Sequence, residues 1–465
     1  MRFLLIYPPT EPYFIQKTKA RSFYGLSPPL SLLYIAKILE NNGDAVTILD
    51  YSTKIFNEQT FFKMIDVADA IGMTIISPSL NEVKKIIELI KRHSPDIPII
   101  IGGPHCTLRP KETLEETGAQ ISVQGDGEVV IQDITKALKG EKALTDIHGI
   151  TFQTPQGIKC NPLAPIISNL DTIPFPARHL LKHSIYGREY NPLLKAGEFT
   201  AVITSRGCPY HCRFCSRSSI TMQQYRIRSN DNIIAELNEI KEQGYRHVAF
   251  VDDCFPIYKK QTIKLFETLK NEGLDLNYSV TATRVDMADQ ELYKKMRRAG
   301  VTHLQFGLES GNQDVLDFYD KKTTIKMIQR AVHLSHETGF FTIGSFIFGA
   351  PFETKEQFQQ TLSFAKSLPL DSVSFLPLRY MVGSDLWNEA VAEEKITEKE
   401  YIVLADKQRE LGQYSAEELL KFCMNAQYSF YARPTFFIHL LKKSLHNNDM
   451  SFMKSFLSTV FSTMK

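Results

Sequence analysis

Along the first 140 residues of the chain, short apolar runs alternate with amphipathic segments. The apolar runs have the length of strands, and the segments between them carry apolar residues at helical spacing. The expected strands are residues 3–7, 45–50, 70–76, 97–102 and 120–123, and the expected helices are residues 30–41, 60–67, 81–94 and 111–117. Strands that alternate with helices predict an α/β fold with a parallel, doubly wound (Rossmann-like) sheet.

The same alternation resumes near residue 201 and continues to about residue 386. The expected strands are residues 201–204, 247–251, 277–282, 302–306, 341–348 and 372–377, and the expected helices are residues 232–243, 260–272, 290–298, 325–338 and 355–367. Six such units predict a partial (β/α)6 TIM-like barrel. In barrels of this kind the chemistry takes place at the carboxyl ends of the strands.

Two further stretches complete the predicted organisation. Residues 141–200 contain several prolines, each of which removes a backbone donor and disfavours helix before it, so an extended linker is expected. Residues 387–465 are predicted to be helical. Within them, residues 430–443 combine aromatic side chains with a basic end, which is typical of an amphipathic helix that covers the barrel; docking to a membrane or a lipid-like substrate is the alternative. The expected domains are residues 1–140, 141–200, 201–386 and 387–465.

Composition narrows the class of protein. The chain of 465 residues is 43% apolar and has a net charge of +2, which gives no electrostatic footprint for nucleic acid. Pro8 and Pro9 interrupt the apolar start of the chain, which is expected to be a buried strand rather than a signal peptide. The sequence contains no run of about 18 apolar residues, so no membrane span is expected. Four of the seven cysteines are scattered, so free thiols and a cytoplasmic location are expected.

Three cysteines form a cluster with a recognisable spacing. Cys208, Cys212 and Cys215 stand in the pattern C-x3-C-x2-C. A [4Fe-4S] cluster has four irons, so three cysteines leave one iron open to another ligand. Zinc sites usually take two pairs of ligands, and no second pair follows here. His211 is the immediate neighbour of Cys212 and would be a strained ligand, so the spacing favours the cluster over zinc.

The stretch from Ser205 to Ser216, including Phe214 before the third cysteine, resembles the signature of the radical S-adenosylmethionine (SAM) enzymes. That resemblance implies that the open iron binds the amino and carboxylate groups of SAM. An electron from the cluster then splits SAM to a 5′-deoxyadenosyl radical. The family fold is the partial barrel that the alternation predicts.

Polar residues fall at the expected carboxyl ends of the later barrel strands. Asp252 and Asp253 are candidates to accept hydrogen bonds from the SAM amino group or from substrate, although acids there also cap helices. Arg284 is a candidate partner of the SAM carboxylate, with a surface pair to Asp286 as the alternative. The resemblance implies that Glu309 accepts from the ribose hydroxyls. It also places the strand segment that ends at Gly349 beside the adenine.

Loops of the first sheet carry the second resemblance. Ser77 offers a hydroxyl, Gly102 and Gly103 let backbone approach a large flat ligand, and residues 125–128 form a tight turn that leads into a helix. Together with the segments at residues 7–9, 100–105 and 124–128, these loops resemble the cobalamin-binding domain of cobalamin-dependent radical SAM enzymes. The implied cobalamin-binding residues are Pro8, Ser77, Gly102, Gly103, His105, Gly125, Gly127 and Glu128. No histidine is expected on the lower face of the corrin. The nearest match to an axial motif, at residues 146–149, lacks the glycine that the motif has three places after its histidine.

The resemblance therefore implies an enzyme with a [4Fe-4S] cluster, SAM and cobalamin. The expected activity is methyl transfer to an unactivated carbon or to phosphorus. In the family mechanism the radical abstracts hydrogen, methylcobalamin delivers the methyl group, and a second SAM remethylates the corrin. An oxidative cyclase or a rearrangement enzyme is the alternative, and a non-catalytic corrin sensor would not need the clustered cysteines. A tRNA methylthiotransferase would need extra cluster cysteines in its N-terminal domain and a basic RNA-binding tail, and the sequence shows neither. The expected partners are a small-molecule or lipid-like substrate and an external electron donor of the flavodoxin or ferredoxin type.

Overall fold

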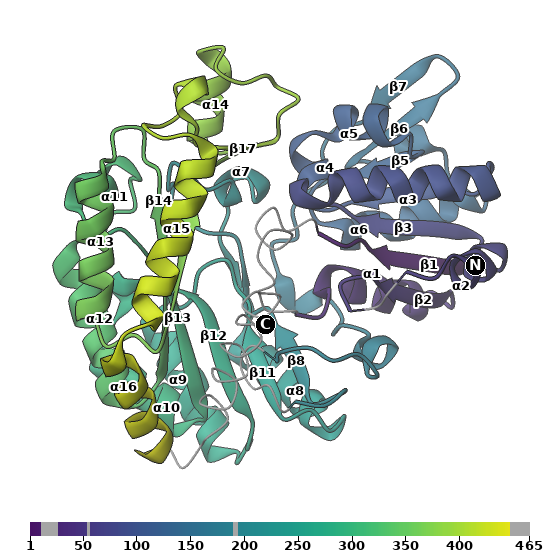
Figure 1. Ribbon diagram of the computed structural model, residues 1–465. Coiled ribbons are helices and arrows are strands. Elements are labelled where there is room, and N and C mark those ends of the chain that lie inside the picture. The colour runs from purple at the N-terminus through teal and green to yellow at the C-terminus, as the bar shows by residue number, and fades with distance from the viewer. Residues whose placement is uncertain (11–26, 54–55, 189–193, 447–465) are drawn as a thin grey trace. The chain divides into compact units, whose positions relative to one another are not determined.

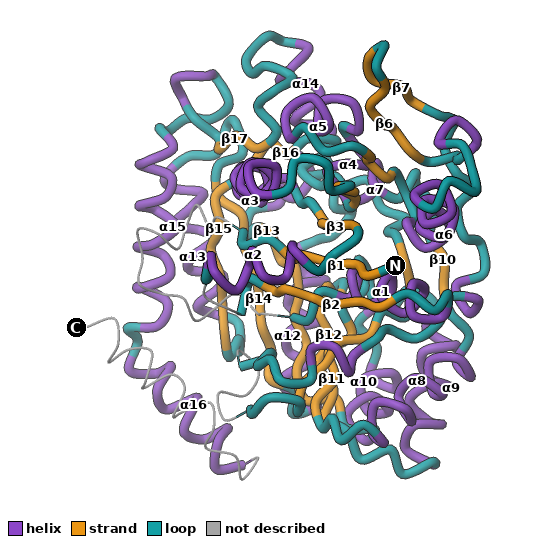
Figure 2. The backbone as a smooth tube through the Cα atoms, turned by 90° about the vertical axis from the view of Figure 1, so that its right-hand side faces the viewer, coloured by secondary structure: helices purple, strands orange, loops and turns teal. Residues whose placement is uncertain are grey.

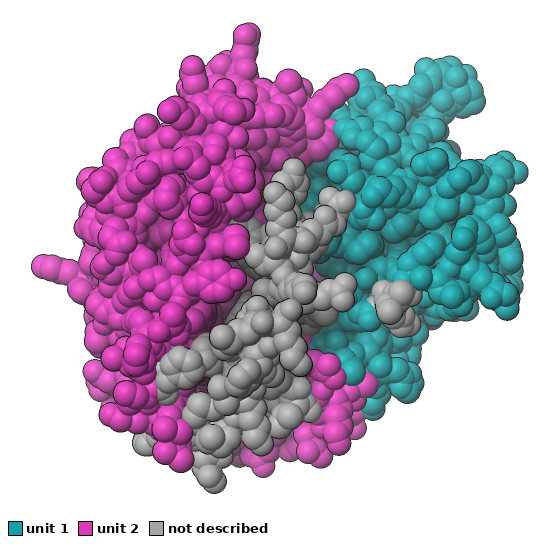
Figure 3. All heavy atoms as spheres, in the orientation of Figure 1, with its two compact units in different colours: residues 1–186 teal, residues 187–465 magenta. Residues whose placement is uncertain are grey.

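The computed structural model describes residues 1–10, 27–53, 56–188 and 194–446. The chain divides into two compact units, residues 1–186 and residues 187–465, which Figure 3 shows in separate colours. Each unit is built around a sheet of its own.

The first unit contains a seven-stranded sheet in the order β2-β1-β3-β4-β5-β6-β7. The strands are β1 (Arg2–Tyr7), β2 (Ala45–Asp50), β3 (Ala70–Thr74), β4 (Ile99–Gly102), β5 (Ile121–Val123), β6 (Ile150–Thr154) and β7 (Gly157–Cys160). The α-helices are α1 (Leu30–Asn41), α2 (Glu58–Asp66), α3 (Leu80–His93), α4 (Pro104–Leu108), α5 (Pro110–Thr117) and α6 (Gly127–Leu138). Strands β1 to β5 run parallel, so the predicted doubly wound sheet is confirmed.

The strand order fixes where a ligand can approach this sheet. The chain passes from β1 to β2 in one direction and then crosses back to β3, so right-handed crossovers place α1 on one face and α2, α3 and α5 on the other. Helix α1 packs against α6, and α3 packs against α2 and α5. The loops after β1 and β3 therefore flank the point where the winding reverses, which is the usual ligand position in such folds.

Two antiparallel strands at one edge were not predicted. β6 pairs with β5 and β7 pairs with β6, within the stretch that was expected to be a linker. Ile150 and Phe152 on β6 are buried, so the strand covers the edge of the parallel sheet. The prolines that suggested a linker lie after β7, where the described part of the chain forms the short 3-10 turns Leu170–Thr172 and Arg178–Leu181.

The second unit contains a parallel six-stranded sheet in the order β15-β14-β13-β12-β11-β8 (Figure 2). The strands are β8 (Phe199–Val202), β11 (His247–Phe250), β12 (Asn277–Thr283), β13 (Val301–Glu309), β14 (Phe341–Phe348) and β15 (Ser372–Pro377). The helices that follow them are α8 (Asn230–Glu242), α9 (Lys259–Asn271), α10 (Gln290–Arg298), α11 (Gln313–Phe318), α12 (Ile325–Thr338) and α13 (Lys355–Ser367). Figure 1 shows α9, α10, α12 and α13 outside the curved sheet. This is the predicted partial (β/α)6 barrel.

Local sequence sets the helix starts of this barrel. The side chains of Ser229, Asp289 and Thr324 accept hydrogen bonds from the first turns of α8, α10 and α12. Such caps satisfy backbone donors that a helix leaves free. A short antiparallel pair, β9 (Ser205–Arg206) with β10 (Arg226–Ile227), and the single-turn helix α7 (Arg217–Ile220) interrupt the chain between β8 and α8.

The carboxyl-terminal part of the described chain is largely helical, as expected. It comprises β16 (Arg379–Met381), α14 (Asp385–Ala392), β17 (Ile402–Leu404), α15 (Ala416–Tyr431) and α16 (Pro434–His446). Residues 430–443 belong to two helices rather than one, because Pro434 lacks a backbone donor and suits the first turn of a new helix. Helix α15 covers β15: the Tyr431 hydroxyl accepts from Val373 N (2.9 Å), and Gln427 Nε2 donates to Val373 O (2.7 Å). Among the described residues, no helix is long and apolar enough to cross a membrane.

Candidate active site

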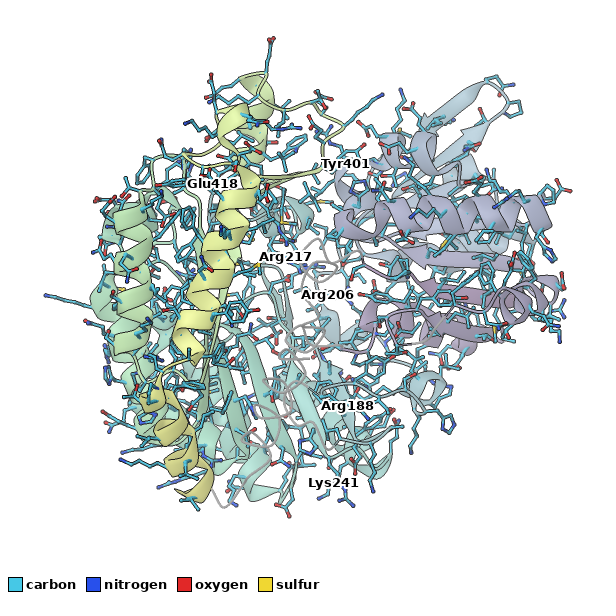
Figure 4. All side chains as sticks on the ribbon, in the orientation of Figure 1. Arg188, Arg206, Arg217, Lys241, Tyr401 and Glu418 are labelled. Atoms are coloured by element: carbon cyan, nitrogen blue, oxygen red, sulfur yellow. The ribbon has the colours of Figure 1, made fainter. Side chains whose placement is uncertain are left out.

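The three clustered cysteines lie in one loop, which begins after β9 and ends at α7. Cys208, Cys212 and Cys215 are all half-buried in it. Arg206 and Arg217, which Figure 4 labels, stand at the two ends of the loop. The loop follows β8, so it occupies the carboxyl end of the first barrel strand. That is the position at which the barrel was expected to carry its chemistry.

Asp252, just after β11, holds the start of this loop. Its carboxylate is buried, and Oδ1 accepts from Thr204 N (2.8 Å), from Ser205 Oγ (2.7 Å) and from the Ser205 N–H. Burial raises the pKa of Asp252 to about 6, and these hydrogen bonds oppose the rise. The contacts favour loop positioning over direct SAM binding for Asp252, and its assignment to SAM stays a prediction.

Asp253 holds the same loop one residue further along. It accepts a hydrogen bond from Gly207 N (3.1 Å) and pairs with Arg217 Nε (3.1 Å). Gly207 has a φ of 93°, and a Cβ there would collide with the carbonyl oxygen of Gln224. Glycine is therefore required where the chain turns into the cysteine loop.

The thiols of the loop have different electrostatic surroundings. A hydrogen bond with the buried Cys254 lowers the pKa of Cys208 to about 7. Burial raises the pKa of Cys212 to about 11, and the positive charges of Lys321 and Arg284 oppose that rise. Burial likewise raises the pKa of Cys215. Two cations therefore lie where thiolate ligands would need charge compensation.

Arg284, after β12, joins the cysteine loop to the turn after α11. Its guanidinium lies 3.4 Å from the centroid of the Tyr210 ring, and Nη2 donates to Lys321 O (3.0 Å). Nε and Nη2 also donate to Asp286 (2.9 Å and 3.1 Å). The pair with Asp286 that was weighed as an alternative therefore exists, although Arg284 is buried rather than on the surface. Its contact with the SAM carboxylate stays a prediction.

Phe214 anchors the loop on the same turn. Its ring meets the buried Tyr319 ring edge-on, with 5.2 Å between centroids. The backbone N–H of Arg213 donates to Tyr319 O (3.1 Å), and Arg213 Nη1 donates to Phe318 O (3.4 Å). Phe214, the aromatic residue before the third cysteine, thus anchors the cysteine loop by packing against the buried Tyr319.

Glu309 ends β13 in a left-handed conformation, with a φ of 61°. The ladder between β13 and β14 shifts register between Gly307 and Glu309, so the strand is irregular at this end. The carboxylate is buried and forms an ion pair with Lys321 Nζ. A buried acid therefore lies in the vicinity of Cys212, as expected for a SAM-site residue; its contact with SAM stays a prediction.

Gly349, after β14, has a φ of 112°, and a Cβ there would stand 2.7 Å from Leu419 Cδ2 of α15. Its N–H donates to Glu353 Oε2 (2.7 Å), which also accepts from Ala350 N (3.1 Å). Burial raises the pKa of Glu353 to about 7. The glycine is required by the turn and by the packing of α15, and the adenine contact stays a prediction.

In the first unit, the predicted cobalamin residues gather at the carboxyl edge of the parallel strands. Pro8 follows β1, Ser77 follows β3, and Gly102 ends β4. Ser77 Oγ lies 3.0 Å from His105 Nδ1, so two of the predicted residues are in contact. His105 is fully buried in α4, and burial lowers its pKa to about 4, which keeps the imidazole neutral.

Glycines shape this edge. Gly103 has a φ of 101°, and a Cβ there would stand 2.6 Å from Thr74 Oγ1, so only glycine lets the loop close on β3. Gly125, after β5, has a φ of 75° and donates to Thr107 Oγ1 of α4 (3.1 Å). Gly127 and Glu128 form the first turn of α6. The structure brings these loops to one edge and leaves their contacts with cobalamin as a prediction.

Comparison with known proteins identifies the family. Residues 202–365 match the radical SAM superfamily, and residues 17–135 match the B12 binding domain. An uncharacterized methyltransferase of Pyrococcus horikoshii is 30% identical over 441 residues, which are 93% of each chain. The chain belongs to the cobalamin-dependent radical SAM family. Its cofactors are a [4Fe-4S] cluster, SAM and cobalamin.

Other relatives of this radical SAM protein carry different names. The anaerobic magnesium-protoporphyrin IX monomethyl ester cyclase of Rubrivivax gelatinosus is 28% identical over 78% of this chain and 66% of its own. The cytidylyl-2-hydroxyethylphosphonate methyltransferase of Streptomyces wedmorensis is 25% identical, over 87% and 86%. The solved structure of TsrM from Kitasatospora setae, with cobalamin and [4Fe-4S] cluster bound, has a TM-score of 0.67 at 19% identity, over 85% of this chain and 75% of that chain. That likeness supports the fold.

The cysteine loop offers three thiols to a [4Fe-4S] cluster. Within the ranges that the structure describes, no three His, Cys, Asp or Glu side chains converge to hold one ion. A [4Fe-4S] cluster does not need such convergence, because each cysteine binds a different iron. With the cations Arg284 and Lys321 nearby, the half-buried thiols suit an anionic cluster.

Sequence analysis missed two residues of this site. Lys321 carries no sequence motif that singles it out, and its burial depends on the turn that follows α11. Cys254 was counted among the scattered cysteines, although it directly follows Asp252 and Asp253 at the end of β11. Its place at a barrel strand terminus was the signal that could have found it.

Proposed function

We propose that this protein is a cobalamin-dependent radical SAM methyltransferase, which moves a methyl group from SAM, by way of cobalamin, to an unactivated carbon or a phosphorus atom. The observation that carries the proposal is the cysteine loop at the carboxyl end of the first barrel strand, in a chain that also matches a cobalamin-binding domain. Two relatives named as methyltransferases favour methyl transfer. When bound, the cofactors supply the radical and methyl-transfer chemistry.

In this proposal Cys208, Cys212 and Cys215 each hold one iron as thiolates, and the fourth iron is left to SAM. Glu309 is assigned to the ribose hydroxyls, and Arg284 to the SAM carboxylate. The bond between Arg284 and Asp286 then has to be shared or exchanged when SAM binds, because the guanidinium has a limited set of donors.

Three further residues act on the barrel side of the site. Phe214 and Asp253 position the cysteine loop through their contacts with Tyr319 and Gly207. Gly349 lets the chain turn at the end of β14, the segment that we assign to the adenine.

For cobalamin, we assign the edge made by the loops after β1, β3, β4 and β5. Pro8, Ser77, Gly102 and Gly103 offer a surface with few side chains, which suits a large flat macrocycle. The first turn of α6, at Gly127 and Glu128, has backbone N–H groups that suit polar groups of the corrin periphery. His105 is buried beside Ser77, so we assign it to the support of that loop, and Gly125 to the turn before α6.

A second candidate function is an oxidative cyclisation on the same cofactors. The observation that favours it is the identity with the anaerobic magnesium-protoporphyrin IX monomethyl ester cyclase. That relative is longer, since this chain spans 66% of it. A methylated product together with S-adenosylhomocysteine separates the two, because cyclisation transfers no methyl group.

We also propose partners and location. The substrate is a small or lipid-like molecule, and an external protein of the flavodoxin or ferredoxin type supplies the electron. A net charge of +2 gives no reason to invoke nucleic acid. The cytoplasm is the proposed compartment, since free thiols persist there.

The test is metal analysis after anaerobic reconstitution with iron, sulfide and cobalamin. The proposal expects about four irons and one cobalt per chain, with reductive cleavage of SAM to 5′-deoxyadenosine. Cys212→Ala should lose both the iron and the cleavage. Cys160→Ala, at an exposed cysteine of β7, is the matched control and should keep them.

Four irons without cobalt would leave a radical SAM enzyme and remove the methyltransferase proposal. Full SAM cleavage by Cys212→Ala would contradict the cluster assignment itself.

A further inference from the structure

A buried ion pair joins Lys321 to Glu309 next to the cysteine loop. The two side chains are 9% and 8% exposed. The next residue, Lys322, is 73% exposed and pairs with Asp320 on the surface. Of two consecutive lysines, one is taken into the interior and the other stays in solvent. Because burying a charged pair costs desolvation energy, its presence calls for a reason beyond stability.

The backbone is arranged to bring this pair together. Asp320 and Lys322, on either side of Lys321, have φ angles of 51° and 58°, and Glu309 has a φ of 61°. Residues other than glycine rarely adopt this left-handed backbone conformation, and those held in it gather at functional sites. At Gly307, a Cβ would stand 2.5 Å from Glu309 Oε1 and 2.7 Å from Lys321 Nζ. Any side chain at residue 307 would therefore displace the pair beside β13.

The turn that carries Lys321 is also tied to the cysteine loop. Arg284 Nη2 donates to Lys321 O (3.0 Å), and the backbone N–H of Arg213 donates to Tyr319 O (3.1 Å). The ring of Tyr319, two residues before Lys321, also packs edge-on against Phe214, which lies between Cys212 and Cys215 in the loop. The ammonium group is thus held at a fixed place between Glu309 and the loop.

We infer that Lys321 is a positioning residue of the cluster site: it holds Glu309 in place for SAM and fixes a positive charge next to the cysteine loop that raises the reduction potential of the cluster. The inference rests on the proposed function, because it requires Cys212 to hold an iron. Reduction adds negative charge to the cluster, so a nearby cation stabilises the reduced form.

The experiment measures iron content, the midpoint potential of the cluster by a redox titration followed by electron paramagnetic resonance, and the dissociation constant of SAM by equilibrium dialysis. The variants are Lys321→Met, Lys321→Arg and Glu309→Gln, with Lys322→Met as the surface control. Lys321→Met should lower the potential and weaken SAM binding by about tenfold, since a charged hydrogen bond is lost. Lys321→Arg should keep the potential, and Lys322→Met should match the wild type in both readouts.

Glu309→Gln gives a change of opposite sign. It leaves Lys321 without its counter-charge, so the potential should rise while SAM binding weakens. A merely structural role would not move the potential in opposite directions in the two variants. If Lys321→Met does not retain iron, Glu309→Gln decides the matter: a potential above that of the wild type supports the inference, and an unchanged potential overturns it.

Equal potentials in the wild type, Lys321→Met and Glu309→Gln, with the cluster intact in all three, would overturn the inference and leave the proposed function standing. A wild-type chain that takes up no iron would instead refute the proposed function.

Discussion

The structure makes a sharp prediction for Asp252, which the sequence assigned to SAM. Asp252→Ala leaves the backbone N–H groups of Thr204 and Ser205 without their acceptor in a buried place. Each orphaned donor costs about 1–3 kcal/mol, so a loss of about 2–6 kcal/mol in the free energy of unfolding is expected. Asp252→Asn keeps Oδ1 as the acceptor, and its amide can donate to Thr204 Oγ1, which lies 3.1 Å from Oδ2. The asparagine variant should therefore retain the bracing.

The pH dependence follows from the pKa of Asp252. The folded-state pKa of about 6 lies above the ordinary aspartate value of 3.8, so the folded protein holds this proton more tightly than the unfolded chain. The contribution of this carboxyl to stability is therefore highest below about pH 4 and falls as the pH rises to about 6, by about 3 kcal/mol in total. Because Asp252→Asn cannot ionise, it should match the wild type at pH 4 and be the more stable protein at pH 7.

In the full chain, tryptophan fluorescence reports the unfolding of the second unit. Trp387 is the single tryptophan of the chain and is buried in α14. Urea titrations of the full chain, monitored by Trp387 fluorescence between pH 4 and pH 7.5, give the stability differences. Equilibrium dialysis of the reconstituted protein gives the affinity for SAM.

Two results would refute this reasoning. Wild-type stability in Asp252→Ala would mean that the carboxylate does not brace the loop. A tenfold loss of SAM affinity in Asp252→Asn, with iron content intact, would mean that the charge itself contacts SAM, as the sequence prediction had it.

Three further changes test other parts of the second unit. Gly207→Ala should reduce iron retention on gel filtration, because its Cβ collides with Gln224 O and moves the cysteine loop; unchanged iron would contradict the need for glycine. Glu236→Ala removes the carboxylate that forms an ion pair with the buried Arg228, so a loss of about 3–5 kcal/mol is expected in urea unfolding, and a loss under 1 kcal/mol would count against it. Tyr431→Phe removes the hydroxyl that bonds to the β15 backbone and should cost about 1 kcal/mol by the same assay, with no change in iron content.

The sequence determined the two sheets and the place of the chemistry. Periodic burial and short caps define elements locally, so the helices at residues 325–338 and 355–367 and the strand at residues 341–348 have the predicted bounds. The spacing of Cys208, Cys212 and Cys215 is equally local, and it alone indicated a cluster with one open iron. The family assignment followed from these residues and agrees with the comparisons.

Long-range packing decided the rest. Strand β6 forms because the edge of β5 is open to it. The sequence of residues 150–154 does not indicate that this segment pairs with residues 121–123. The roles of Asp252, Arg284 and Lys321 depend on contacts across the barrel ends, which sequence distance hides. A carboxylate at a strand terminus looks the same in sequence whether it faces a ligand or braces a neighbouring loop. Only the tertiary structure distinguishes these cases, because the free energy of a buried polar group depends on which partners surround it.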